Sequence, residues 1–258
     1  MKVVPFRIPK YTEESFRVQV DDMPHLYNHL HQHPEIQLTL IKESHGTLIA
    51  GDYVGPFHAG DVIIIGSNQP HVFRNDEKYF RNKYKAVAIT VFFDEYTLGE
   101  KFWQLPEMKP LQWFFKNSLG GFRVKGKKRK YLAEKLEILV AAKGIDRITC
   151  FLEILKVLDS RKELQPLSRP VNQRNIKTYD GTRLSTILEF TFQEFQRTIT
   201  LKEVASLAHL TPEAFCKYFK TRTRKTYISF LNEIRINHAC RKLTGEQTIT
   251  DICFDCGF

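Results

Sequence analysis

The spacing of apolar residues changes along this chain, and that change limits the folds it can adopt. Between about residues 35 and 93, short β-branched runs such as 62–65 and 86–93 are separated by glycine-containing turns. From about residue 128, apolar residues recur at i, i+3, i+4 and i+7, the period of an amphipathic helix. Short strands with regular turn signals indicate a sandwich or barrel. We therefore predict an α+β chain with an N-terminal antiparallel β-barrel followed by helices.

The length of 258 residues fits two domains at roughly 100–200 residues each. We expect a barrel domain with a C-terminal helix pair at 1–165, a polar, proline-containing linker at 166–182, and an all-α domain at 183–258. Gly144 separates the two helices of the pair. The pair could pack on its own barrel or form a dimer interface. We expect a homodimer, with packing on the same domain as the alternative use of this helix pair.

The net charge indicates which kind of partner the chain binds, and the cysteine content indicates the redox state of its cellular compartment. The formal net charge of +10 favours a polyanion such as nucleic acid. Five cysteines, an odd number with none in the first half of the chain, do not form a disulfide framework. A reducing cytoplasm fits this pattern. The sequence has no signal-peptide pattern and no apolar run of about 20 residues, so we expect no membrane segment.

Two helix starts follow each other closely after residue 199. Thr200 and Glu203 have the spacing of a capping box, and Thr211-Pro212 supplies an N-cap followed by proline at the first helical position. The residues between them, 208–210, form a turn. A short helix, a turn and a second short helix are typical of a helix-turn-helix unit.

The second of these helices has two different faces. At about 100° per residue, Phe215 and Phe219 lie on one side and suit packing against the first helix. The other side could enter a major groove, where Lys217 would donate to guanine and Glu213 would accept from cytosine. A solvated helix face is the alternative. The residues predicted to contact double-stranded DNA are Thr211, Glu213, Ala214, Cys216, Lys217, Lys220, Arg222, Arg224 and Lys225.

The C-terminal third resembles the AraC/XylS family of bacterial regulators. The similar segments are "ITLKEVASLAHLTPEAFCKYFK", "SFLNEIRINHACRKL" and "ITDICFDCGF". The resemblance implies two helix-turn-helix units joined by a long helix, sequence-specific DNA binding and control of transcription. Gly257-Phe258 matches the turn before the second recognition helix, so the second unit is incomplete in this chain. The resemblance also implies that Glu213, Cys216 and Lys217, on the first recognition helix, contact bases.

Two other features of the sequence have a structural explanation that we prefer. Cys253 and Cys256 form a lone CxxC at positions where the family has apolar helix residues, so we expect both to be buried. The basic run from Arg123 to Lys130 is expected to be a solvated loop, with a second nucleic-acid contact as the alternative.

Three histidines lie at the ends of predicted strands. His31 and His33 share one face of a strand, and His71 follows another, so all three could converge on one metal ion. These motifs resemble the cupin superfamily, in which a glutamate usually completes the ligand set. Gln37 stands at that position. Because Gln37 lacks the negative charge of that glutamate, we predict that the chain binds no metal ion and no cofactor.

We expect a pocket in the barrel mouth instead, with His31, His33, Gln37 and His71 as its polar groups. The resemblance suggests a sugar or other metabolite as effector. Purely structural histidines are the remaining alternative.

The two halves together predict a transcription regulator that is not an enzyme. The alternative is a cupin-type metal enzyme, a sugar isomerase or dioxygenase, with a helical appendage. Gln37 argues against it, because metal enzymes need their full ligand set.

Overall fold

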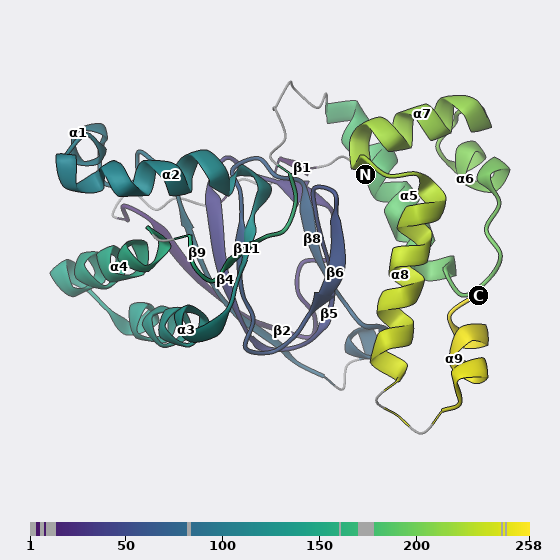
Figure 1. The fold of residues 1–258 in the computed structure, drawn as a ribbon, viewed down its shortest axis with the longest axis horizontal. Helices are drawn as coiled ribbons and strands as arrows, with labels where there is room; N and C mark the ends of the chain where they lie inside the picture. The colour runs from purple at the N-terminus through teal and green to yellow at the C-terminus, as the bar shows by residue number, and fades with distance from the viewer. Residues whose placement is uncertain are drawn as a thin grey trace.

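The computed structural model describes residues 4–5, 8, 14–81, 84–159, 161–169, 178–243, 245 and 247–258. Strands fill the centre of the molecule, helices that come before the C-terminal ones lie on one side of them, and the C-terminal helices lie on the opposite side (Figure 1). We call the described residues up to 169 the N-terminal part and residues 178–258 the C-terminal part.

The described strands form two sheets that pack face to face. The larger sheet has the order β11-β10-β7-β4-β9-β2, and the smaller has the order β1-β3-β8-β5-β6. All pairs are antiparallel except β1 with β3. The strands of the larger sheet are β2 (Arg17–Met23), β4 (Ile36–Glu43), β7 (Val62–Ile65), β9 (Ala86–Phe93), β10 (Phe122–Val124) and β11 (Leu164–Pro166). Those of the smaller sheet are β1 (Val4–Pro5), β3 (His31–Gln32), β5 (Gly46–Ala50), β6 (Tyr53–Phe57) and β8 (His71–Asn75).

The predicted antiparallel β domain followed by helices is confirmed, with one correction. Among the described residues the strands pair into two sheets and not into one closed barrel. The register shifts between Ile41 and Glu43, at the end of β4, and the next strand belongs to the other sheet. Bulges of this kind let a chain leave one sheet for another.

Both faces of strand β7 are buried, and this explains why its sequence is apolar throughout. Val62 and Ile64 belong to the cluster between the larger sheet and the covering helices. Ile63 and Ile65 belong to the cluster between the two sheets. Because side chains alternate along a strand and both faces are buried, every position of β7 is apolar.

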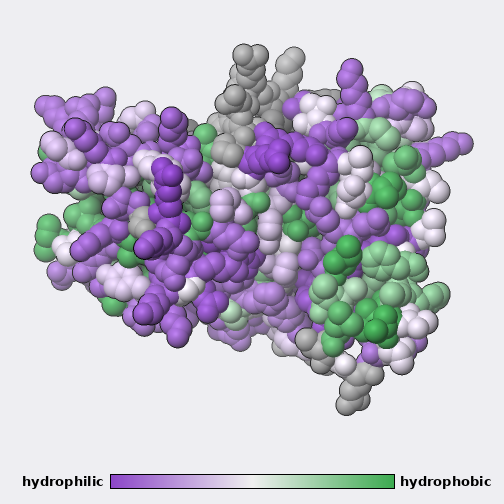
Figure 2. Space-filling model, viewed as in Figure 1, coloured by the Kyte–Doolittle hydropathy of each residue, from purple (hydrophilic) through white to green (hydrophobic). Residues whose placement is uncertain are grey.

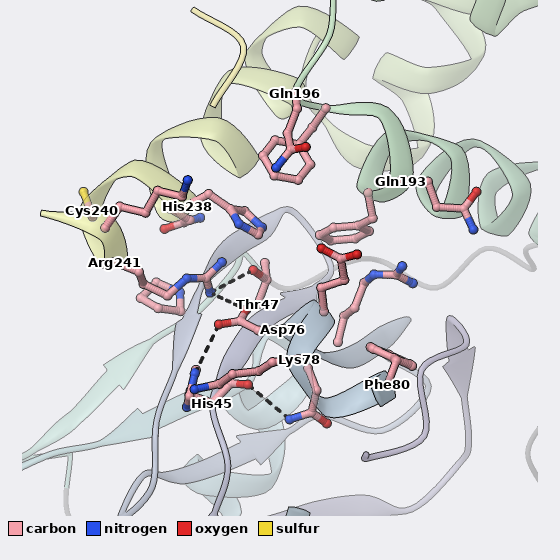
Figure 3. A pocket seen from close by; sticks show the side chains of 18 of the residues that line it. His45, Thr47, Asp76, Lys78, Phe80, Gln193, Gln196, His238, Cys240 and Arg241 are labelled. Carbon is pink, nitrogen blue, oxygen red and sulfur yellow. Dashed lines mark hydrogen bonds and ion pairs between the residues drawn. The ribbon is translucent and has the colours of Figure 1, made fainter. Parts of the chain in front are cut away.

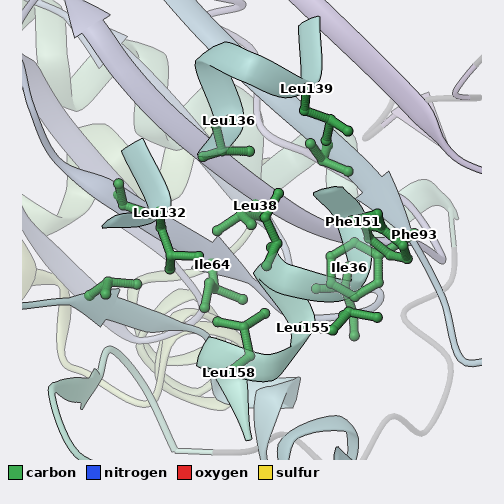
Figure 4. Packing of buried hydrophobic residues seen from close by; sticks show 14 of the residues in the cluster. Ile36, Leu38, Ile64, Phe93, Leu132, Leu136, Leu139, Phe151, Leu155 and Leu158 are labelled. Carbon is green, nitrogen blue, oxygen red and sulfur yellow. The ribbon is translucent and has the colours of Figure 1, made fainter. Parts of the chain in front are cut away.

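Helices α2 (Lys109–Asn117), α3 (Gly126–Ala141) and α4 (Gly144–Leu158) cover the outer face of the larger sheet. Leu132, Leu136 and Leu139 of α3 are fully buried there, together with Phe151 and Leu155 of α4 (Figure 4). The helix pair thus packs on its own domain. Homodimerisation stays a prediction.

The basic run after residue 122 is not the solvated loop that we predicted. Arg123 lies in β10 and is buried, with an ion pair to Asp61 and a hydrogen bond from Nη2 to the Pro56 carbonyl oxygen. Glu163 accepts hydrogen bonds from the backbone nitrogens of Lys127 and Lys128 in the first turn of α3. The run is therefore partly structural, because it anchors a strand and starts a helix.

The C-terminal part contains α5 (Thr178–Glu194), α6 (Leu201–Leu207), α7 (Pro212–Thr223), α8 (Tyr227–Lys242) and α9 (Ile249–Asp255). Its core includes the fully buried side chains of Ile187, Phe215, Phe219 and Ile234. Leu30, Ile49 and Val72 of the N-terminal part join the same cluster. The two parts therefore share apolar contacts. The predicted linker at 166–182 stays a prediction, since residues 170–177 lie outside the described residues.

The end of the chain carries an exposed apolar surface. Thr248 caps α9 by accepting a hydrogen bond from the Asp251 backbone nitrogen. Cys256 is buried as predicted, but Cys253 is exposed. Ile249 and Phe254 are 72% and 81% exposed, and the space-filling view shows apolar residues gathered over α9 (Figure 2). No helix among the described residues is long and apolar enough to span a membrane.

Candidate functional site

Hydrogen bonds at the helix starts hold the α6–turn–α7 unit. The Thr200 hydroxyl accepts a bond from the Glu203 backbone nitrogen at 3.2 Å. The Thr211 hydroxyl accepts one from the Ala214 backbone nitrogen at 3.3 Å. His209, in the turn between the helices, has a positive φ of 52°. Each cap satisfies a backbone donor that the helix itself cannot pair, so local sequence fixes where α6 and α7 begin.

Helix α7 presents the face that the sequence predicted. Phe215 and Phe219 are fully buried against the rest of the C-terminal part. The other predicted contacts on this helix project outward. Thr211, Glu213, Ala214, Cys216, Lys217 and Lys220 are all exposed. An exposed, mixed-charge helix face of this size can insert into a major groove.

The cations after Lys220 differ from one another in exposure. Arg224 is exposed at the end of α7, in the left-handed conformation with a φ of 59°. Arg222 is half-buried, with its guanidinium 6.0 Å from the centroid of the Tyr218 ring. Lys225 is also half-buried, and its Nζ lies 2.6 Å and 2.7 Å from the two carboxylate oxygens of Glu233. Lys225 thus joins α7 to α8, and a role in contacting phosphate would need this ion pair to open.

The four predicted pocket residues of the N-terminal part come together. His31 lies opposite His71 in the register of β3 and β8, and their ring centroids are 4.2 Å apart. The Nε2 atoms of His33 and His71 each lie 3.0 Å from Gln37 Oε1. All four side chains are buried, His71 completely. The structure therefore brings the four residues together in the interior, and their role as the polar groups of a ligand pocket stays a prediction.

The three imidazoles are oriented by the backbone. The Nδ1 atoms of His31, His33 and His71 lie 2.8–3.0 Å from the carbonyl oxygens of His29, Glu35 and Gln69. Nδ1 therefore carries the proton, and Nε2 presents its lone pair to the cluster. Burial lowers the pKa of His31 to about 4 and lowers those of His33 and His71 as well. All three rings are neutral at neutral pH.

The donor set fits a transition-metal ion, although it does not require one. The three histidines offer ligand atoms within 4.8 Å of one another, and neutral imidazoles held by backbone carbonyls are suitable ligands. Gln37 would supply an amide oxygen where a carboxylate is usual. The amide can instead turn so that its NH2 group donates to His33 and His71. Its oxygen then accepts from the Thr39 hydroxyl, which lies 2.9 Å from the Gln37 amide.

A cavity of about 1060 Å³ lies between the smaller sheet and helices α5 and α8 (Figure 3). Arg74, Asp76 and Lys78 line it from the N-terminal part, and Phe192, His238 and Arg241 line it from the C-terminal part. Sequence analysis missed this site entirely. Its residues come from segments more than 100 positions apart and carry no shared motif, so no local signal was available.

The comparisons with known proteins agree with the helical geometry. Residues 204–258 match the family described as "Helix-turn-helix domain". No curated protein sequence matches the chain. Among solved structures, ToxT from Vibrio cholerae is similar over 95% of this chain and 90% of that chain, at 12% identity and a TM-score of 0.37. The AraC-like transcriptional activator CuxR is similar over 86% and 72%, at 10% identity and a TM-score of 0.36.

A capped helix, a turn and a second helix with an exposed face, in a segment that matches this domain family, define a DNA-binding transcription regulator. Within the chain, residues 204–258 are the helix-turn-helix domain, at the place where the sequence resemblance predicted one.

Proposed function

We propose that this chain regulates transcription by binding a specific double-stranded DNA site through α7, and that its N-terminal part senses a small-molecule effector. The observation that carries the proposal is the division of α7 into a fully buried aromatic face and an exposed face with Glu213, Cys216 and Lys217. The net charge of +10 supports it, because cations near the groove contact phosphates without reading sequence.

The alternative, a metal-dependent enzyme of the cupin type, is not favoured by the geometry. A catalytic metal site keeps one position open for water or substrate. His33 is 2% exposed and His71 is 0% exposed, and both face Gln37 within the interior. Substrate would have to displace the side chains that bury these two imidazoles. We therefore propose that the chain is not an enzyme.

A salt-dependent titration tests the proposal. The purified chain is titrated with the DNA upstream of its own gene and with a scrambled competitor. We expect Lys217→Ala to weaken specific binding by about 1–3 kcal/mol, because the lysine would contact a base edge. Lys156→Ala removes the same charge from the exposed surface of α4 and is the matched control. Equal loss in the two variants, or equal affinity for the scrambled DNA, contradicts sequence-specific binding through α7.

A further inference from the structure

The cavity between the two parts carries more positive than negative charge. Arg74, Lys78, Arg241 and Lys242 line it, against the two carboxylates of Asp76 and Glu77. Several of these groups are already paired: Arg241 with Asp76, Lys242 with Asp255, and Glu77 with Arg81. Among the described residues, no carboxylate forms an ion pair with Arg74 or Lys78. The cavity therefore contains two cations that a ligand could neutralise.

Arg74 is the more informative of the two. Its guanidinium carbon lies 4.9 Å from the ring centroid of Phe192 and 5.8 Å from that of Phe80. Phe192 belongs to α5 and Phe80 to the N-terminal part, so Arg74 lies where the two parts meet. Burial lowers the pKa of the Arg74 guanidinium, and the charge of Glu189, which is paired with His29, partly opposes this. Aromatic rings hold this half-buried cation in place. An anion that reaches its N–H edge binds favourably, because it neutralises a charge that has already lost part of its water.

The lining also offers apolar surface for the rest of a ligand. Phe80, Phe192 and Phe195 border the cavity. The Phe195 ring packs on His238, with centroids 4.2 Å apart. A volume of about 1060 Å³ exceeds what a simple inorganic ion needs and is at the upper end of the range for small-molecule sites.

We infer that this cavity binds a small organic anion with an apolar body, held by Arg74 and Lys78 against the phenylalanine rings. Its role as the effector rests on the proposed function. A ligand that touches Arg74 on one part and α8 on the other stabilises the docked arrangement of the two. It therefore shifts the population toward that arrangement in proportion to its differential affinity.

Fluorescence titration with 8-anilinonaphthalene-1-sulfonate tests for the site in the whole chain. The matched probe is N-phenyl-1-naphthylamine, which has the same aromatic rings and no sulfonate. We expect Arg74→Gln to weaken binding of the anionic probe by at least about tenfold, since a charge-assisted contact is lost. Binding of the neutral probe should change by less than about twofold. Lys42→Gln, on the far surface and paired with Glu137, is the control.

A second variant keeps the test independent of folding. Lys78 is half-buried, and its ammonium lies 4.7 Å from the centroid of the Tyr84 ring. Because the side chain is only half-buried, we expect Lys78→Gln to leave the core intact. It should weaken the anionic probe selectively in the same way. If the anionic probe binds wild type, Arg74→Gln and Lys42→Gln equally well, with wild-type thermal unfolding, the inference is overturned.

Two exposed cysteines report where the probe binds. Cys240 lines the cavity, whereas Cys216 lies on the outward face of α7. Alkylation by N-ethylmaleimide, followed by mass spectrometry, should show Cys240 protected by the anionic probe and Cys216 unaffected. Equal labelling of Cys240 with and without probe places the probe elsewhere, for example on the apolar surface of α9, and rejects the site.

DNA binding is measured separately, so the two proposals can fail independently. A change in affinity for the specific DNA on addition of the anionic probe, absent in Arg74→Gln, supports the effector role. A chain that protects Cys240 but does not bind specific DNA has the ligand site and lacks the proposed function. A chain that binds specific DNA but shows no Arg74-dependent probe binding has the function and lacks this site.

Discussion

Arg241 of α8 forms an ion pair with Asp76, which directly follows β8, with 3.2 Å between Nη1 and Oδ1. The other oxygen of Asp76 lies 3.3 Å from Nε2 of His45. One carboxylate of the N-terminal part thus contacts the helix that follows the DNA-binding unit. This contact joins the two parts of the chain beside the cavity.

Asp76→Asn should therefore weaken the docking of the two parts. Arg241 is largely buried, and leaving such a cation without its carboxylate costs more than losing a surface pair. We expect a decrease of about 1–3 kcal/mol in the free energy of unfolding, measured by urea denaturation. Glu77→Gln, one residue along, removes an exposed pair with Arg81 and should cost less than about 0.5 kcal/mol. Equal effects of the two substitutions would show that the ion pair between Asp76 and Arg241 contributes no more to the free energy of unfolding than an exposed pair does.

Thr211→Ala should destabilise the start of α7. The lost hydroxyl leaves the Ala214 backbone nitrogen without its cap, at a cost of about 0.5–2 kcal/mol. Thr221→Ala is the control, because its hydroxyl bonds only to the Lys217 carbonyl oxygen within the same helix. Both variants are compared by thermal unfolding. A smaller effect at Thr211 than at Thr221 would argue against the capping assignment.

Gln37→Glu should convert the histidine cluster into a metal site. A carboxylate beside three converging imidazole nitrogens restores the charge that helps to hold a divalent ion. After dialysis against zinc chloride and then metal-free buffer, we expect about one zinc per chain in this variant and substoichiometric zinc in wild type. The double variant with His71→Gln should lose the ion again. One tightly held ion per wild-type chain would overturn the expectation and reopen the enzyme hypothesis.

Acid should destabilise the chain through His238. Burial, together with the repulsion from Arg241, Lys242 and Arg74, lowers the pKa of His238 to about 3. Because the unfolded value is 6.5, the folded state binds fewer protons below that pH. The contribution of His238 is complete above about pH 6.5 and is lost progressively as the pH falls toward 3. The free energy of unfolding of His238→Gln should consequently fall less between pH 7 and pH 5 than that of wild type.

The control for this prediction is His58→Gln, which replaces an exposed histidine that also lines the cavity. Its free energy of unfolding is measured at the same two pH values in the same urea experiments, and the loss is compared with that of His238→Gln. If His238→Gln and wild type lose stability in parallel, another group accounts for the acid sensitivity.

Sequence predicted best what depends on neighbouring residues. Thr200 and Thr211 begin helices where their spacing to the next helical residues indicated, because a cap needs only a few consecutive positions. The short β-branched run at residues 62–65 likewise predicted a strand, which is β7. The clustering of His31, His33, Gln37 and His71 followed from motif positions that a known superfamily shares.

Sequence predicted least what depends on distant pairing. Arg123 is one cation in a basic run, and only its contact with Asp61, 62 positions earlier, makes it a buried anchor. Arg74 and Phe192 meet across 118 positions, the difference of their residue numbers, and no periodicity reports that contact. Whether strands close into one barrel or form two sheets depends on such pairings too, which explains the correction to the fold.

Helix α8 runs from the end of α7 to the contact with the N-terminal part. With 16 residues it is about 24 Å long at 1.5 Å per residue. Its first turn adjoins the end of α7, and its last turn carries Arg241 beside Asp76. A tilt of about 5° about one end would displace the other end by about 2 Å over that length. Hydrogen bonds to base edges fail over a displacement that large, so a small rotation at the cavity is enough to set or break the register of α7 on DNA.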